Sequence, residues 1–294
     1  MASPGWFDKI LFATDGSASS LVAEELTAFV AKKFKSKVTV IHAIFSTFSE
    51  SIGLPLTRPV EEGRIYLSPC APEVFEEISA SLTQRGAAIV ANAVAFFKAE
   101  GIEVDQRIEN DDATEAILNE AESGSYGLIT MGSSGETKRK PHLGSVAKKV
   151  ALNAKTSVLI AREREISKIL VPVDGSENSR KAFEHAVALA RETDSKITLM
   201  NVMDSNFFMG KPELSREIGK KILSQAADKA EGVKIYQRLE PGKPAETIIR
   251  IAQDEDFDLI VMGSRGHGAM KRWLLGSVSD HVIHYTDRSV LLVK

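Results

Sequence analysis

The sequence has almost no cysteine, no long apolar run and no excess of either charge. Its single cysteine, Cys70, cannot form an internal disulfide and has no second thiol with which to share a metal ion, so a reducing compartment is favoured. We interpret Cys70 as an incidental loop thiol, with redox sensing as the alternative. The apolar runs are strand-sized, well short of the ~20 residues that a membrane-spanning helix needs, and the first residues lack the pattern of a secretory signal. We therefore expect a cytoplasmic protein without a membrane partner.

The charges nearly cancel, with 37 Lys and Arg against 40 Asp and Glu and a pI near 6.1. This balance gives no electrostatic argument for a nucleic-acid partner. The sequence also lacks the GxxxxGK[ST], HExxH, GxSxG and paired CxxC motifs, so no catalytic residue and no metal cage are predicted. We expect His42 to be packed or hydrogen-bonded at a strand end, and catalysis is the alternative. His267 is expected to be an exposed loop residue, with a place beside a phosphate or metal as its alternative.

One pattern occurs twice in the 294 residues, which is a comfortable length for two domains. The run KILFAT at 9–14 is followed by Asp-Gly-Ser, and KILVPV at 168–173 is followed by the same three residues. In each copy, strand-sized apolar runs then alternate with segments that have one apolar face at helical spacing. The predicted strands span 9–14, 37–44, 103–108, 127–131 and 157–160 in the first copy, and 168–173, 196–203, 233–239, 259–262 and 289–293 in the second.

This alternation predicts an α/β protein with two tandem doubly wound, Rossmann-like domains, each containing a five-stranded parallel sheet covered on both faces. The charged run at 162–165 is the natural junction, a short tether, and gives domains 1–165 and 166–294. Only the first copy carries a long insertion, at 46–76. Its apolar content indicates that it packs, and we consider it a lid over the first site or an oligomer contact.

A glycine loop stands out in the stretch from 258 to 293. A buried strand ends at Gly263, Gly266 follows, and after nine further residues Gly276 and Ser277 open an amphipathic segment. Glycines at a strand exit expose backbone N–H groups, and a helix that starts at Ser277 adds its free amides and its positive dipole end. The loop is therefore interpreted as a cradle for the phosphates of a nucleotide. Lys271 and Arg272, in the spacer, are expected to be solvated, with direct phosphate contact as the alternative.

The Asp-Gly-Ser sequence predicts the other side of the same crevice. In a doubly wound sheet of strand order 3-2-1-4-5, the loops after the first and fourth strands face each other at the switch point where ligands bind. Asp174 would then accept hydrogen bonds from ribose hydroxyls beside the glycine loop. The alternative is that these three residues only form a turn and cap the following helix.

These motifs resemble the universal stress protein family in its ATP-binding branch, and because they occur twice the chain looks like a tandem member. The resemblance implies the adenine nucleotide alpha hydrolase-like variety of the fold, binding of ATP, ADP or AMP, and Mg²⁺ or Mn²⁺ carried by a triphosphate. It places Asp174 on the ribose, Val202 at the base, and the loop and helix start on the phosphates. The implied second-half site residues are Pro172, Val173, Asp174, Val202, Met262, Gly263, Arg265, Gly266, Gly276, Ser277, Val278 and Ser279.

The first half matches this pattern more loosely. Only eight residues separate Gly135 from Gly144, Pro141 interrupts that spacer, and Ala147 stands where the second half has Ser279. A second nucleotide site and a degenerate, structural copy both remain open. The corresponding residues are Ala13, Thr14, Asp15, Ala43, Met131, Gly132, Ser134, Gly135, Gly144, Ser145 and Val146.

The leading hypothesis is an adenine-nucleotide-binding regulator that acts in the stress response, with its best site in the second half. One alternative is a slow ATPase or autophosphorylating enzyme with Ser277 or Ser279 as acceptor. The other is a structural dimerisation module without nucleotide. The resemblance also implies that the last strands join the halves into an internal pseudo-dimer, which could pair again into a homodimer. The protein partner is left open.

Overall fold

The computed structural model describes residues 5–44, 72–134, 143–204, 212–228, 230, 232–266 and 275–294. Residues 46–71 of the predicted insertion lie outside this part of the chain, as do Cys70, Gly135, Pro141, His267, Lys271 and Arg272. In the described part, no helix combines the length and the apolar character that a bilayer crossing requires.

The first half alternates strands and helices, as predicted. Its elements are β1 (Lys9–Ala13), α1 (Ala18–Phe34), β2 (Lys37–Ala43), α3 (Pro72–Ala99), β3 (Val104–Glu109), α4 (Ala113–Ser123), β4 (Leu128–Gly132), α5 (Ser145–Asn153) and β5 (Ser157–Ala161).

The second half repeats this order, which confirms the βαβαβαβαβ interpretation of both copies. Its elements are β6 (Lys168–Pro172), α6 (Glu177–Thr193), β7 (Lys196–Met203), α7 (Pro212–Ala227), β8 (Ile235–Pro241), α8 (Pro244–Asp254), β9 (Leu259–Gly263), α9 (Ser277–Tyr285) and β10 (Ser289–Val293).

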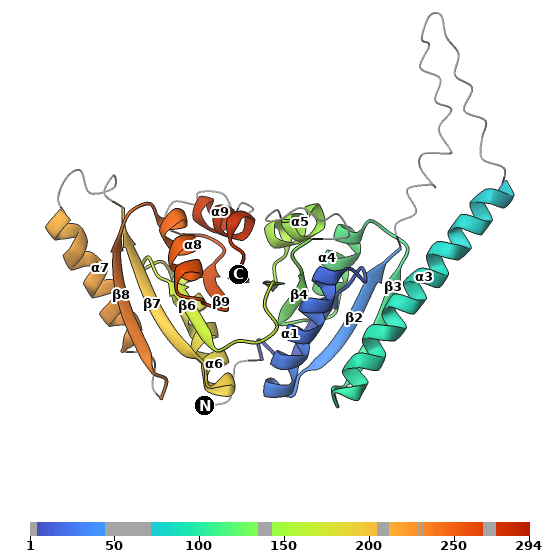
Figure 1. Ribbon diagram of the computed structural model, residues 1–294, viewed down its shortest axis with the longest axis horizontal. Helices are drawn as coiled ribbons and strands as arrows, with labels where there is room; N and C mark the ends of the chain where they lie inside the picture. Colours follow the sequence, from blue (N-terminus) through green and yellow to red (C-terminus); the bar gives the residue numbers. More distant parts are fainter. Residues whose placement is uncertain are drawn as a thin grey trace, which may run out of the picture.

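A single ten-stranded sheet runs through both halves in the order β3-β2-β1-β4-β5-β10-β9-β6-β7-β8. Counted from its own first strand, each half has the predicted order 3-2-1-4-5, and its strands are parallel. The halves meet where β5 pairs antiparallel with β10, with Leu159 opposite Leu291. The expectation that the last strands join the halves is therefore confirmed, and Figure 1 shows the two halves on either side of this seam.

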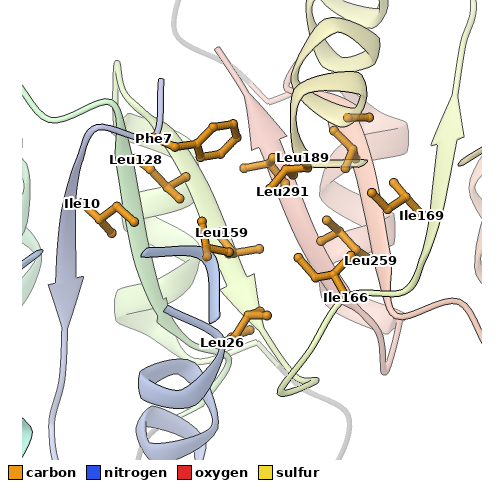
Figure 2. Close-up of a cluster of buried hydrophobic side chains, with 14 of the residues drawn as sticks. Phe7, Ile10, Leu26, Leu128, Leu159, Ile166, Ile169, Leu189, Leu259 and Leu291 are labelled. Atoms are coloured by element: carbon orange, nitrogen blue, oxygen red, sulfur yellow. The ribbon is translucent and has the colours of Figure 1, made fainter. Parts of the chain in front are cut away.

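Helices cover both faces of the sheet, whose inner strands β4, β5, β9 and β10 are buried almost throughout, whereas the edge strands β3 and β8 carry exposed residues. One buried cluster joins the sheet to α1, α3, α6 and α7, and a second joins it to α4, α5, α8 and α9. Figure 2 shows part of the first cluster, in which Leu26, Leu159 and Leu291 bring α1, β5 and β10 together. The core thus continues across the seam, and each fully buried aliphatic side chain stabilises it by about 1.5–3 kcal/mol.

The segment before β1 also crosses between the halves. Trp6 stacks on His185 of α6, with the ring centroids 3.7 Å apart and the planes 10° from parallel. Phe7 is buried and packs against Phe34 of α1 and the edge of His185. His185 Nδ1 lies 2.9 Å from the carbonyl oxygen of Lys181, which can only accept, so this nitrogen carries the proton. Burial lowers the pKa of His185 to about 4, which means that the contact is built on a neutral imidazole.

The predicted tether at 162–165 is not simply a solvated linker. The backbone N–H groups of Arg162 and Glu163 both donate to Ser289 Oγ, at 3.0 and 2.9 Å. Arg162 is partly buried, and Arg164 forms an ion pair with Glu25 of α1. Contacts with residues that are distant in the sequence therefore hold this segment against the seam.

We expect His185 to make the fold sensitive to acid. Its pKa is about 6.5 in the unfolded chain and about 4 in the fold, so the unfolded state takes up the proton first as the pH falls. Its contribution is complete above pH 6.5 and is lost as the pH falls towards 4, up to about 3 kcal/mol. Urea unfolding at pH 7 and at pH 4.5 measures this loss.

The matched control is His185→Phe, which retains a ring for Trp6 to stack on but cannot titrate. Because other groups titrate equally in both proteins, the difference between their pH profiles isolates His185. Parallel profiles from pH 7 to 4.5 would contradict the prediction.

Candidate functional site

The loops after β1 and β4 meet in the first half, as the strand order requires. Ser134 N–H donates to Ser19 Oγ at 3.1 Å, and Ser17 Oγ donates to the Ser134 carbonyl at 3.4 Å. Gly132 lies so close to α1 that an added Cβ would be 2.7 Å from the backbone carbon of Ser19. A glycine is needed at this position because a helix backbone passes directly against it.

A cavity of about 240 Å³ lies at these strand ends. Ten of the eleven predicted first-half residues line it, and the eleventh, Gly135, is outside the described residues. These ten are Ala13, Thr14, Asp15, Ala43, Met131, Gly132, Ser134, Gly144, Ser145 and Val146.

The cavity is also lined by six residues that the sequence analysis did not assign to the site. Ala113 and Ile117 come from α4, which the predicted site did not include. No local pattern marks them, because only the packing of α4 against the sheet brings them to the cavity. The full set is Ser20, Ile41, His42, Ala113, Ile117 and Ala147.

The wall of the cavity combines apolar side chains with the start of a helix. Ile41, Ile117 and Met131 form an apolar part of the wall. At another part, α5 begins at Ser145 with Gly144 as its N-cap, and no side chain caps the helix. The first amides of α5 and its positive dipole end are therefore presented to the cavity. Such a wall suits a ligand that joins an apolar ring to an anionic group.

Asp15 lies on the cavity wall and also forms the predicted turn. Its Oδ1 accepts from Ser17 N–H at 3.0 Å, and Ser17 in turn is the N-cap of α1. The second half repeats this with Asp174 Oδ1 and Ser176 N–H at 2.9 Å, and Ser176 caps α6. In both halves the aspartate thus forms the turn and the serine caps the helix, which confirms this structural role. A ligand role for either aspartate stays a prediction.

The second half brings its two loops together in the same way. An added Cβ at Gly266 would lie 2.6 Å from Asp174 Oδ2, so the glycine loop passes directly beside the aspartate. Gly276 N–H donates to the Ser264 carbonyl at 2.8 Å, and α9 begins at Ser277 without a side-chain cap. The other predicted residues lie at the strand ends and helix start around these loops: Pro172, Val173, Val202, Met262, Gly263, Arg265, Val278 and Ser279.

Ser279 has a structural bond in this arrangement. It is buried, and its hydroxyl donates to the Gly263 carbonyl at 2.8 Å, which ties α9 to the end of β9. Ser277, by contrast, is exposed at the helix start. Ala147 occupies the position of Ser279 in the first half and cannot make this bond. The predicted contact of Ser279 with phosphate stays a prediction.

His42 is hydrogen-bonded, as expected. Its Nδ1 donates to the Thr14 carbonyl at 2.8 Å, and at the equivalent place Asn201 Nδ2 donates to the Val173 carbonyl at 2.7 Å. Both bonds hold the backbone just before the aspartate. Among the described residues, no group of three or more His, Cys, Asp or Glu is placed to hold a metal ion.

Comparison with known sequences agrees with the repeat and the loops. The profile of the universal stress protein family matches residues 7–162 and again residues 165–294. The chain belongs to the universal stress protein family. A universal stress protein of Methanocaldococcus jannaschii is 37% identical over 149 residues, which are 47% of this chain and 88% of that protein. A putative universal stress protein of Staphylococcus saprophyticus is 33% identical over 137 residues, 43% of this chain and 82% of its own.

A solved structure of the family shows the same fold along nearly the whole chain. A universal stress protein of Archaeoglobus fulgidus covers 98% of this chain and 98% of its own, with a TM-score of 0.71 at 22% identity. Another universal stress protein was solved in complex with cAMP. It covers 44% of this chain and 97% of its own, at 26% identity and a TM-score of 0.36, and the bound cAMP is a ligand of that protein.

Two glycines of the second loop should respond very differently to alanine. At Gly263 an added Cβ would meet the backbone carbon and oxygen of Asn178 at 2.8 and 2.9 Å, whereas at Gly276 the nearest atom is at 3.3 Å. Because backbone atoms of a helix cannot move aside freely, Gly263→Ala should destabilise the fold by about 1–3 kcal/mol more than Gly276→Ala. Urea unfolding of the two variants measures the difference, and equal stabilities would contradict the geometry.

Proposed function

We propose that this universal stress protein binds an adenine nucleotide in each half and acts as a nucleotide-responsive regulator. The observation that carries the proposal is the first-half cavity, whose wall combines apolar side chains, an aspartate and the uncapped start of a helix. These three features match the base, the sugar and the phosphates of a nucleotide.

The geometry supports one orientation of the nucleotide. The adenine would lie against the apolar wall near Ala43 and Ile117, and the phosphates would approach Gly144 and Ser145, where α5 presents its first amides. The ribose would then lie beside Asp15, whose carboxylate can accept from its hydroxyls.

Equivalent features support a site in the second half. Asp174 and Gly266 are in direct proximity, and Gly276 and Ser277 repeat the uncapped helix start. The second half also carries Arg265, where the first half has Ser134, and a positive charge in this loop favours phosphate. We therefore propose two sites per chain.

A binding role is favoured over catalysis because the polar side chains near the sites are already hydrogen-bonded to the backbone. Asp15 and His42 are the titratable side chains on the described wall of the first cavity, and each already holds a backbone group. In the second half, the hydroxyl of Ser279 is bonded to Gly263. Occupancy would then act through the positions of the loops and of α5 and α9, which partner proteins could recognise.

Asp15→Asn tests the ribose contact without removing the turn. The asparagine carbonyl can still accept from Ser17 N–H, but its other atom becomes a donor and no longer accepts from a hydroxyl. Loss of a hydrogen bond to a charged group predicts about tenfold or more weaker ATP binding at the first site. Isothermal titration calorimetry measures both affinity and equivalents, with two ATP per chain expected for the unmodified protein.

The control ligand is 2′,3′-dideoxy-ATP, which lacks the ribose hydroxyls. If Asp15 acts on the ribose, Asp15→Asn should weaken ATP binding but leave dideoxy-ATP binding almost unchanged. An equal loss for both ligands would reject the ribose role. A folded protein that binds no adenine nucleotide would reject the proposed function.

A further inference from the structure

In each half, the residue after the last strand is a cation that reaches across the seam. Arg162 follows β5, and its guanidinium donates to the Ile283 carbonyl at 2.7 Å and to the Arg288 carbonyl at 3.2 Å. Lys294 follows β10, and its Nζ donates to the Ala151 carbonyl at 2.6 Å. Ile283 and Ala151 occupy equivalent positions in the last turns of α9 and α5. Each cation therefore caps the C-terminal, negative end of a helix in the other half.

The helix that Lys294 caps also forms part of the first cavity. α5 spans nine residues, from Ser145 to Asn153, and is about 13 Å long at 1.5 Å per residue. Its first residues, together with Gly144, line the cavity, and its last turn holds Lys294. Since so short a helix moves as a rigid unit, the position of its capped end affects the end at the cavity.

The other end of this connection is the second glycine loop. Gly276 N–H donates to the Ser264 carbonyl, and Ser264 N–H donates to the carbonyl of Val293, both at 2.8 Å. Val293 is the residue before Lys294. Two hydrogen bonds thus connect the start of α9 through the loop to Val293, and the next residue along the chain, Lys294, holds α5.

An electrostatic interaction also connects the second glycine loop with Lys294. Burial and, after it, the positive charge of Arg265 lower the pKa of Lys294 to about 8, so Arg265 opposes the charged form of this lysine. Arg265 belongs to the glycine loop, where phosphates would neutralise its field. The first half has the uncharged Ser134 at this position, so this electrostatic interaction originates from the second half.

We propose that Lys294 couples the two sites, so that a nucleotide bound at the second glycine loop strengthens the Lys294 contact with α5 and raises the affinity of the first cavity. The proposal rests on the proposed function of both sites. The coupling is positive because bound phosphates offset the repulsion from Arg265, and thermodynamic reciprocity requires that the first site favours the second equally.

Calorimetry with ATP on three chains isolates the coupling. Asp174→Asn weakens the second site and Asp15→Asn weakens the first, so the unchanged site fills first in each variant, and the unmodified protein contains both sites at full affinity. With the two single-site constants known, the only free quantity in the two-site titration is the coupling factor, which we expect to be about fivefold in favour of joint occupancy.

Three variants test the assignment to Lys294. Lys294→Met keeps most of the aliphatic stem but lacks the ammonium, and it should reduce the coupling factor to one. Lys294→Arg retains a cation and should restore coupling, which a purely packing role would not predict. Lys155→Met removes an exposed lysine that pairs with Glu122 and should leave coupling unchanged.

The outcomes separate the two proposals. Two ATP molecules bound with a coupling factor of one in the unmodified protein would overturn the role of Lys294 while the proposed function stands. Coupling that persists in Lys294→Met would do the same. Absence of ATP binding in all three chains would overturn the proposed function and the coupling together.

Discussion

The antiparallel pairing of β5 with β10 is the contact on which the rest of the structure depends. Each half alone would leave its last strand as an open sheet edge, and both strands are buried along their whole length in the joined structure. Pairing them satisfies the backbone groups of both edges and turns two sheets into one. The core cluster, the Trp6–His185 stack and the residues after β5 all cross this seam.

The same topology produces the site twice. Where β1 and β4, or β6 and β9, lie side by side, the chain leaves the two strands towards different faces, and a crevice opens at their ends. An aspartate turn closes one side, and a glycine loop leading to an uncapped helix closes the other. The loops of the two halves differ in charge, with Ser134 in the first and Arg265 in the second, so a shared framework carries two chemically distinct loops.

Much of the fold could be predicted from the sequence because its signals are local. Strand-sized apolar runs, helical spacing and the repeated Asp-Gly-Ser placed every element, although the limits of some shifted. The third strand of the second half was expected at 233–239, and β8 spans Ile235–Pro241, because its limits follow the pairing with β7 up to Met203 and Pro241. Ten first-half cavity residues were recognised for the same reason, since they sit on motifs. Ala113 and Ile117 were missed because helix packing, which no local pattern specifies, brings α4 to the cavity.

The sequence by itself determined the repeated unit, its alternation of strands and helices, and the glycine and aspartate motifs, because backbone turns, buried strands and helix starts each demand particular residues at short spacing. Tertiary structure decided what Arg162 and Lys294 do. The charged run at Arg162 was expected to be a tether, yet its side chain caps α9, and the lysine that closes β10 caps α5, 143 positions away in the chain. Only the pairing of the two last strands brings these groups together, since a hydrogen bond between distant residues depends on the whole path of the chain between them.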